Sequence, residues 1–249
     1  MHEEINLLKA DLDQDNDLVI GKRHYWSGKL YGKNVVLVFS RWGKVASAST
    51  ATTLIDRFGV EGIVFTGVAG AADLELEIGD IVISSALIQH DMDVSPLPTF
   101  NKFEIPLLGI SRFAANNVFI ERMQISAKKY VESEIFNEIE PEILEQFDIK
   151  KPRVKVGLIA SGDHFVADHK IISQLKQELN DLLCVEMEGA AVAQVCFEHD
   201  IPFVVTRAIS DKANRSAIID FPCFVSKIAC FYSRGMIRRM LLEWEEPNP

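Results

Sequence analysis

The chain has 249 residues, of which 48% are hydrophobic and 25% charged, and its formal net charge is −10. This composition is typical of a globular protein and excludes a collagen-like, coiled-coil or wholly disordered chain. The acidic balance argues against nucleic acid or an anionic membrane as a partner, because both attract a basic face. No stretch approaches the roughly 18 apolar residues of a membrane span. Residues 1–20 contain no apolar signal core, so we expect a cytoplasmic protein.

The cysteines argue against a metal or redox site. Cys184, Cys196, Cys223 and Cys230 each lie in an apolar context. None forms a CxxC pair, and no histidine cluster lies nearby at the spacing of a zinc site. We therefore expect buried free thiols in a reducing compartment, and neither a metal nor another cofactor.

Short apolar runs alternate with helical patterns, which indicates an α/β fold with three layers: a mostly parallel, mixed central sheet flanked by helices. The predicted elements, in chain order, are strand 35–40, helix 44–58, strands 62–66 and 81–87, helix 112–130, strands 154–160 and 182–187, helix 190–199, strand 203–210 and helix 221–244. Residues 91–109 are predicted to be a loop and residues 132–150 an acidic surface segment. No linker divides the sequence, so we expect one domain over 1–249 with a frayed tail at 245–249.

Polar residues follow several of the predicted strands, where open α/β sheets bind their ligands. Glu186 and Glu188 flank Met187 before an apolar helix. These carboxylates are either held at the sheet edge for chemistry or only favoured by the dipole of the helix N-terminus. Asp211 arrives with Ser210 at the end of strand 203–210. It is either a proton donor with a raised pKa or a cap of the next turn.

Three other segments carry weaker signals. Residues 66–71 are rich in glycine but lack both the dinucleotide fingerprint and the lysine of a P-loop, so they either admit a ligand to the backbone or form a tight turn. Phe165 could stack on a planar base or be an ordinary core residue. His164 beside it is expected to be structural. Glu4, taken alone, is a charge near the start of an N-terminal helix.

Together, these segments resemble the methylthioadenosine/S-adenosylhomocysteine nucleosidases of the nucleoside phosphorylase superfamily. The matching pieces are 1–5, 43–46, 66–70, 79–82, 90–94, 161–163, 185–189 and 208–211, in the family's order. The most specific pair is Val-Glu-Met-Glu-Gly with Ala-Ile-Ser-Asp. The resemblance implies a nucleoside phosphorylase-like fold and a reaction in which water cleaves the bond between adenine N9 and ribose C1′, giving adenine and a 5-thioribose. It also implies a place in methionine salvage.

The resemblance implies catalytic roles for three carboxyl groups. Asp211, beside Ser210, would protonate adenine N7 and improve the leaving group. Glu188 would hydrogen-bond the ribose hydroxyls and stabilise the cationic sugar, because the transition state resembles an oxocarbenium ion. Glu4 would activate the attacking water.

The resemblance also implies how the substrate is bound. Adenine would stack on Phe165 and be read by the backbone of Val166, the ribose would lie over Met187, and Phe221 would border the 5′ substituent. The other residues expected to line this pocket are Val68, Ala69, Gly70, Glu186, Arg207 and Ser210.

The sequence departs from the family at three places. Family members open with an apolar strand before the Met-x-x-Glu segment, whereas this sequence starts at that segment, so we expect the first strand to be missing and the position of Glu4 to depend on what fills the gap. Arg41 and Trp42 replace smaller residues, with no role that the sequence assigns. Val68 replaces a serine, which removes one polar contact near the water.

Two other functions remain open. A nucleoside phosphorylase would use phosphate instead of water, but only Arg41 and Arg207 lie near the predicted loops and Glu4 would repel phosphate. A non-catalytic purine-binding protein would not need the proton donor Asp211. A hydrolase acting on another adenosine derivative, such as an aminodeoxyfutalosine, is not distinguished by sequence. The resemblance also implies a homodimer in which the apolar loop 91–109 covers the partner's pocket.

Overall fold

The computed structural model describes residues 2–244, except for the side chains of residues 2–4. Its central sheet has the strand order β6-β5-β7-β8-β4-β9, and β5 also pairs with β9, so the sheet curls back on itself. The β4–β9, β5–β7 and β7–β8 pairs are parallel and the other three are antiparallel. The strands are β4 (Ile63–Ala71), β5 (Ile81–Gln89), β6 (Arg112–Ala114), β7 (Val154–Ser161), β8 (Leu182–Glu186) and β9 (Phe203–Asp211).

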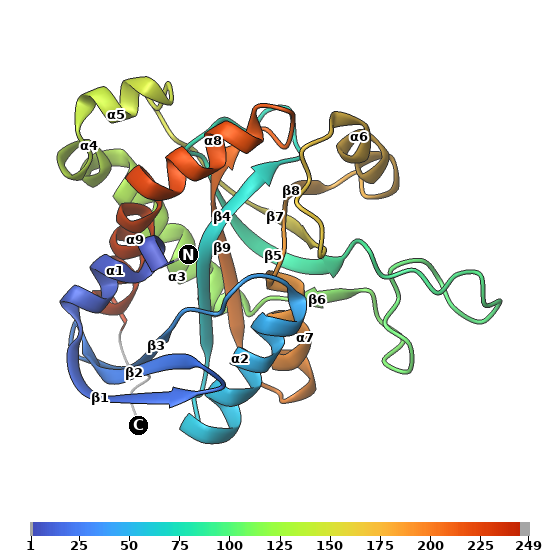
Figure 1. Cartoon of the computed structure of the whole chain (residues 1–249), viewed down its shortest axis with the longest axis horizontal. Coiled ribbons are helices and arrows are strands. Elements are labelled where there is room, and N and C mark those ends of the chain that lie inside the picture. The colour runs from blue at the N-terminus through green and yellow to red at the C-terminus, as the bar shows by residue number, and fades with distance from the viewer. Residues whose placement is uncertain (1, 245–249) are drawn as a thin grey trace.

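Helices cover the central sheet on both faces, which confirms the predicted three-layer α/β fold (Figure 1). On one face, Ala51 and Ala193 share a core with the sheet; on the other, Met123 and Met236 do so. These residues belong in turn to α2 (Lys44–Phe58), α7 (Gly189–Glu198), α3 (Asn117–Lys129) and α9 (Cys230–Leu242). The remaining α-helices are α1 (His2–Asp11), α4 (Ile135–Glu138), α5 (Pro141–Gln146), α6 (His169–Glu178) and α8 (Ala217–Phe224).

A second, antiparallel sheet precedes α2. It consists of β1 (Asp13–Ile20), β2 (Arg23–Leu30) and β3 (Lys33–Val38). Only the last of these strands was predicted. Seven of the eight residues of β1 are exposed, and its Asp and Asn residues disfavour strands, so the sequence gives no signal there. The pairing with β2, which buries Tyr25 and Trp26, holds it in place.

Several predicted boundaries were wrong for identifiable reasons. The glycine-rich segment is not a turn, because residues 67–69 pair with 207–209 of β9 and extend β4 to Ala71. Residues 132–150 are not merely a surface segment, since Ile135, Ile139 and Leu144 are buried. The predicted helix 221–244 begins earlier, at Ala217, and a π-helical turn (Val225–Ala229) interrupts it. Helix α6 had no predicted counterpart.

Other sequence expectations can be compared directly. Helix α2 has the predicted bounds and ends at Gly59, whose φ of 61° is left-handed. The predicted loop 91–109 extends away from the rest of the molecule (Figure 1). Cys184 and Cys196 are buried free thiols, whereas Cys223 and Cys230 are partly exposed. Within residues 2–244, no helix is long and apolar enough to cross a membrane, and no cluster of side chains could hold a metal ion.

Candidate active site

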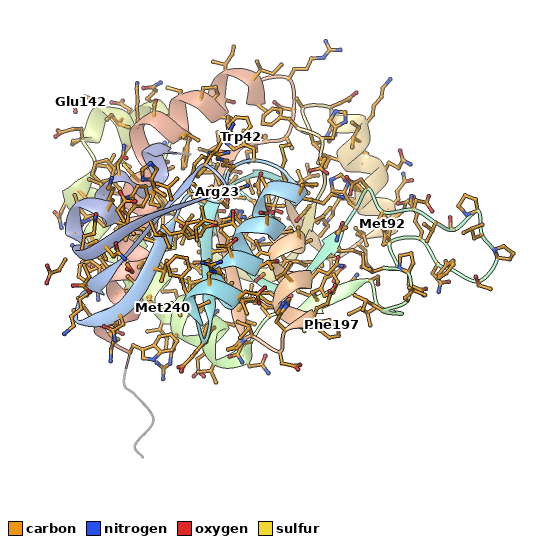
Figure 2. The ribbon with its side chains drawn as sticks, turned by 60° about the horizontal axis from the view of Figure 1, so that its bottom comes forward. Arg23, Trp42, Met92, Glu142, Phe197 and Met240 are labelled. Atoms are coloured by element: carbon orange, nitrogen blue, oxygen red, sulfur yellow. The ribbon has the colours of Figure 1, made fainter. Side chains whose placement is uncertain are left out.

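A cavity of about 1240 Å³ opens at the carboxyl ends of β4, β8 and β9 and continues between β3 and β4. Two of its lining residues, Trp42 and Met240, lie well apart in Figure 2. The predicted site residues that line it are Val68, Ala69, Gly70, Phe165, Val166, Glu186, Met187, Glu188, Arg207, Asp211 and Phe221. Ser210 lies behind this lining, fully buried, and the side chain of Glu4 lies outside the described residues.

Asp211 ends β9 as a buried carboxyl group. Burial raises its pKa, although Ser210 Oγ and the Ala213 backbone N–H each donate a hydrogen bond to it at 2.8 Å. The bond from Ala213 shows that the carboxyl also stabilises the following turn. Asp211 therefore caps the following turn, and its burial raises its pKa at the same time. A raised pKa keeps a carboxyl group protonated, and so able to donate a proton, to a higher pH than usual.

Glu188 lies at the start of α7 and accepts a hydrogen bond from the Gly43 backbone N–H at 2.7 Å. Burial, followed by the charge of Glu186, raises its pKa to about 7, although the bond from Gly43 and the charge of Arg207 act in the opposite direction. The Gly43 bond joins the loop before α2 to the start of α7. This contact fixes the carboxyl group at the cavity wall. An ionised Glu188 would favour a positive charge developing in the cavity.

Glu186 behaves differently from Glu188. It forms a buried ion pair with Arg207 at 2.6 Å, with both side chains 2% exposed. Its carboxylate also accepts hydrogen bonds from Ser161 and from the backbone N–H groups of Glu188 and Gly189. The Glu186 carboxylate thus caps the N-terminus of α7, where the helix dipole favours a negative charge. Glu186 and Arg207 line the cavity, but their charges are directed at one another.

Three aromatic rings form an exposed cluster at the mouth of the cavity. Phe221 meets Phe165 with ring centroids 5.4 Å apart and Trp42 with centroids 6.1 Å apart, both edge-on. Phe165 is 38% exposed, so it is not an ordinary core residue. A ring left accessible in this way offers a face for a planar group to stack on.

Gly70 lets β4 approach Asp211 closely. A Cβ added there would lie 2.9 Å from Asp211 Oδ1 and 3.0 Å from the Ala213 side chain. Any larger residue would therefore displace the carboxyl group. The glycine-rich end of β4 is needed for this contact, which a turn would not provide.

Comparison with known proteins identifies the family. A profile of the phosphorylase superfamily matches residues 1–228. The 5′-methylthioadenosine/S-adenosylhomocysteine nucleosidase of Anoxybacillus flavithermus is 33% identical over 98% of this chain and 95% of its own length. The chain belongs to the methylthioadenosine/S-adenosylhomocysteine nucleosidase family. It is therefore a nucleosidase, that is, an N-glycosidase hydrolase, as the sequence resemblance implied.

Solved structures agree with this family assignment. The Neisseria meningitidis nucleosidase in complex with methylthio-immucillin-A has a TM-score of 0.85 and 29% identity, covering 98% of this chain and 96% of that chain. A futalosine hydrolase of Helicobacter pylori has a TM-score of 0.80 and 30% identity, covering 98% of this chain and 95% of that one. The same fold thus occurs in hydrolases named for different nucleosides.

Sequence reasoning did not assign three residues that the nucleosidase cavity depends on. Gly43 holds Glu188, Ser161 holds Glu186, and Trp42 completes the aromatic cluster. Gly43 and Ser161 lie in segments that match the family's motifs, so these motifs could have pointed to both residues. Gly43 contacts Glu188 through its backbone N–H, and Ser161 contacts a residue 25 positions away in the sequence. No local sequence pattern predicts either contact.

Proposed function

We propose that this nucleosidase hydrolyses the N9–C1′ bond of 5′-methylthioadenosine and S-adenosylhomocysteine. The observation that carries the proposal is the pair Asp211 and Glu188: two carboxyl groups with raised pKa values on the wall of one cavity. Cleavage of a glycosidic bond needs an acid for the leaving group and a negative partner for the sugar cation. The names of the relatives supply the substrates.

In the proposed mechanism, Asp211 gives its proton to adenine N7 as the N9–C1′ bond breaks. The bonding electrons leave with adenine, and positive charge develops on the ribose ring. Ser210 donates to Asp211 Oδ2 at 2.8 Å and so fixes the orientation of the acid. Ser210 then stabilises the carboxylate that remains after proton transfer.

Glu188 would hydrogen-bond the ribose hydroxyls and stabilise the cation. The developing positive charge would favour ionised Glu188 and so lower its raised pKa during the reaction. Glu4 would remove a proton from the water that attacks C1′. The backbone of Glu4 lies in the first turn of α1, and its side chain lies outside the described residues.

The binding roles follow from the lining. Adenine would stack on Phe165, with its edge against the backbone of buried Val166, and the ribose would lie over Met187. Trp42 and Phe221 would enclose the 5′ substituent. Val68, Ala69 and Gly70 would line the floor, and Ser210 would act through Asp211.

Water is favoured over phosphate as the nucleophile. Arg207 is committed to Glu186, and Arg41 donates a hydrogen bond to the carbonyl of Lys22. The charge of Arg207 is thus already compensated by a carboxylate and does not neutralise a phosphate in the cavity. A futalosine-type nucleoside remains a second candidate substrate, because a hydrolase of that name shares the fold.

The test is adenine release from methylthioadenosine, with and without phosphate, by the parent chain and by Asp211→Asn. We expect phosphate-independent release, reduced at least about 100-fold in Asp211→Asn. Asp181→Asn is the matched control, because Asp181 is 48% exposed and pairs with Arg112 on the surface. Phosphate-dependent release would replace the hydrolase by a phosphorylase, and an unchanged rate in Asp211→Asn would remove Asp211 from the mechanism.

We further propose that the enzyme is a cytoplasmic homodimer. Leu97 and Leu107, at 56% and 97% exposed, lie on the loop 91–109, which would cover the partner's pocket. The free thiols fit a reducing compartment. Light scattering at micromolar concentration should give a dimer, and a fully active monomer would contradict this assembly.

A further inference from the structure

Lys44, Asp91 and Asp163 form a cluster of charged side chains to which the proposed chemistry assigns no role. Lys44 is the first residue of α2, Asp91 lies just after β5, and Asp163 lies just after β7. None of the three lines the cavity. Their segments nevertheless reach the proposed site, because Gly43 precedes Lys44 and holds Glu188, and the segment of Asp163 continues into the cavity wall.

Two carboxylates from distant parts of the chain hold the amino end of α2. The Gly43 backbone N–H donates to Glu188 Oε1 at 2.7 Å, and the Lys44 backbone N–H donates to Asp163 Oδ1 at 2.8 Å. A helix favours negative partners at this end, where its N–H groups lack partners within the helix. Gly43 has a positive φ of 87°, and a Cβ there would lie 3.1 Å from Asp163 Oδ1, so glycine permits both contacts. A movement of Asp163 would therefore disturb the neighbouring bond to Glu188.

The side chain of Lys44 ties α2 to the ends of β5 and β7. Its ammonium group, on a side chain only 16% exposed, donates to Asp91 Oδ1 at 2.5 Å and to Gln89 Oε1 at 3.2 Å. The other oxygen of Asp91 accepts a hydrogen bond from the Asp163 backbone N–H at 2.9 Å. Although burial acts to raise the pKa of Asp91, the bonds from Lys44 and Asp163 hold that pKa below its usual value. Asp91 therefore stays ionised, and its two oxygens hold two different segments together.

We propose that Lys44 and Asp91 are positioning residues for the nucleosidase reaction, an inference that rests on the proposed function. On one side of the cluster, the residue before Lys44 donates to Glu188, which would face the ribose. On the other side, Asp163 precedes Phe165 by two positions, and adenine would stack on that ring. The cluster thus fixes the carboxylate and the ring relative to one another without touching the substrate. A displacement of about 1 Å in such a geometry can lower a rate about 100-fold.

Asp91→Asn tests the proposal with the smallest change in shape. Asparagine has a single acceptor oxygen, so it cannot accept from both Lys44 Nζ and the Asp163 N–H. We expect exchange of the backbone amides of residues 43 and 44 to become at least about 10-fold faster, although Asp91 bonds neither amide. The value of kcat/KM for methylthioadenosine should fall about 10–100-fold. Asp181→Asn, which removes the carboxylate of an exposed ion pair, is the matched control and should change neither quantity.

The pH profile separates positioning from a direct effect of charge. Removal of the negative charge of Asp91 would by itself lower the pKa of Glu188, whereas a weaker bond from Gly43 would raise that pKa. We therefore expect the acid limb of kcat/KM to move up by at least about 0.5 pH unit in Asp91→Asn. The other charged and titratable side chains on the segments around Glu188 are unchanged in this variant; they are Arg41, Lys44, His90, Asp163, His164, Glu186, Arg207 and Asp211.

Unchanged exchange at residues 43 and 44, or an acid limb that moves to lower pH, would overturn the proposal. Lys44→Met is the second variant, since it removes the ammonium group and keeps an apolar stem. The double variant should lose no more than about twofold beyond the worse single variant, because residues of one cluster are not additive, and additive losses would overturn the proposal. Faster exchange in chains that release no adenine would count against the proposed substrate but for the cluster. Adenine release with unchanged exchange would count against the cluster.

Discussion

The raised pKa of Glu188 predicts how the stability of the protein changes with pH. Burial, with the charge of Glu186, raises that pKa from 4.5 to about 7. One pKa unit corresponds to about 1.36 kcal/mol. Because the folded pKa lies above the unfolded value, the stabilisation is fully present below about pH 4.5 and is lost as the pH rises through about 7. Ionising Glu188 therefore costs the folded state about 3 kcal/mol at pH 8.

The substitution Glu188→Gln isolates this effect. The glutamine carbonyl can still accept the bond that Gly43 N–H donates at 2.7 Å, but the side chain has no charge to bury. We expect the variant and the parent to be equally stable at pH 4. At pH 8 the variant should be more stable by about 3 kcal/mol, which corresponds to a Tm roughly 6–12 °C higher.

The assay is thermal unfolding of both chains from pH 4 to pH 8, with Glu121→Gln as the control. Glu121 is an exposed glutamate on α3, so its replacement should leave the pH profile unchanged. A gap between Glu188→Gln and the parent that stays constant over the whole range would refute the reasoning, because burial of an ionisable group requires the gap to grow with pH.

Three further outcomes follow from the site. The value of kcat/KM should rise with pH through about 7 as Glu188 ionises and fall again at higher pH as Asp211 loses the proton that it donates, and an acid limb centred below pH 5 would contradict the proposed role of Glu188. Glu186→Ala should lower the free energy of unfolding by about 3–5 kcal/mol, since it leaves Arg207 charged and buried without a partner. Denaturant titration measures this loss. A loss below about 1 kcal/mol would mean that the ion pair between Glu186 and Arg207 does not stabilise the fold. Trp42→Ala should raise KM for methylthioadenosine roughly 2–10-fold with kcat unchanged, and a loss confined to kcat would remove Trp42 from the 5′ subsite.

The sequence predicted those helices and strands whose own residues carry a recognisable pattern. Helix α2 was predicted with its bounds because the segment is rich in Ala, Ser and Thr and is followed by Gly59, which can adopt the left-handed conformation that ends a helix. The apolar runs of β5, β7, β8 and β9 were predicted because strands buried on both faces carry no polar alternation. The polar strand β1 was not predicted, since it has no apolar run and its stability comes from pairing with β2.

Some features of the candidate site could likewise be predicted from the sequence, and others could not. The sequence by itself determined the fold class, the family and the acidic residues at the strand ends, because these depend on residue identity and order along the chain. Only the tertiary structure separated Glu186, neutralised by Arg207, from Glu188, whose burial raises its pKa. Only the tertiary structure brought Trp42 to Phe221. Burial, charge pairing and strand pairing arise between residues distant in sequence, and no local pattern contains them.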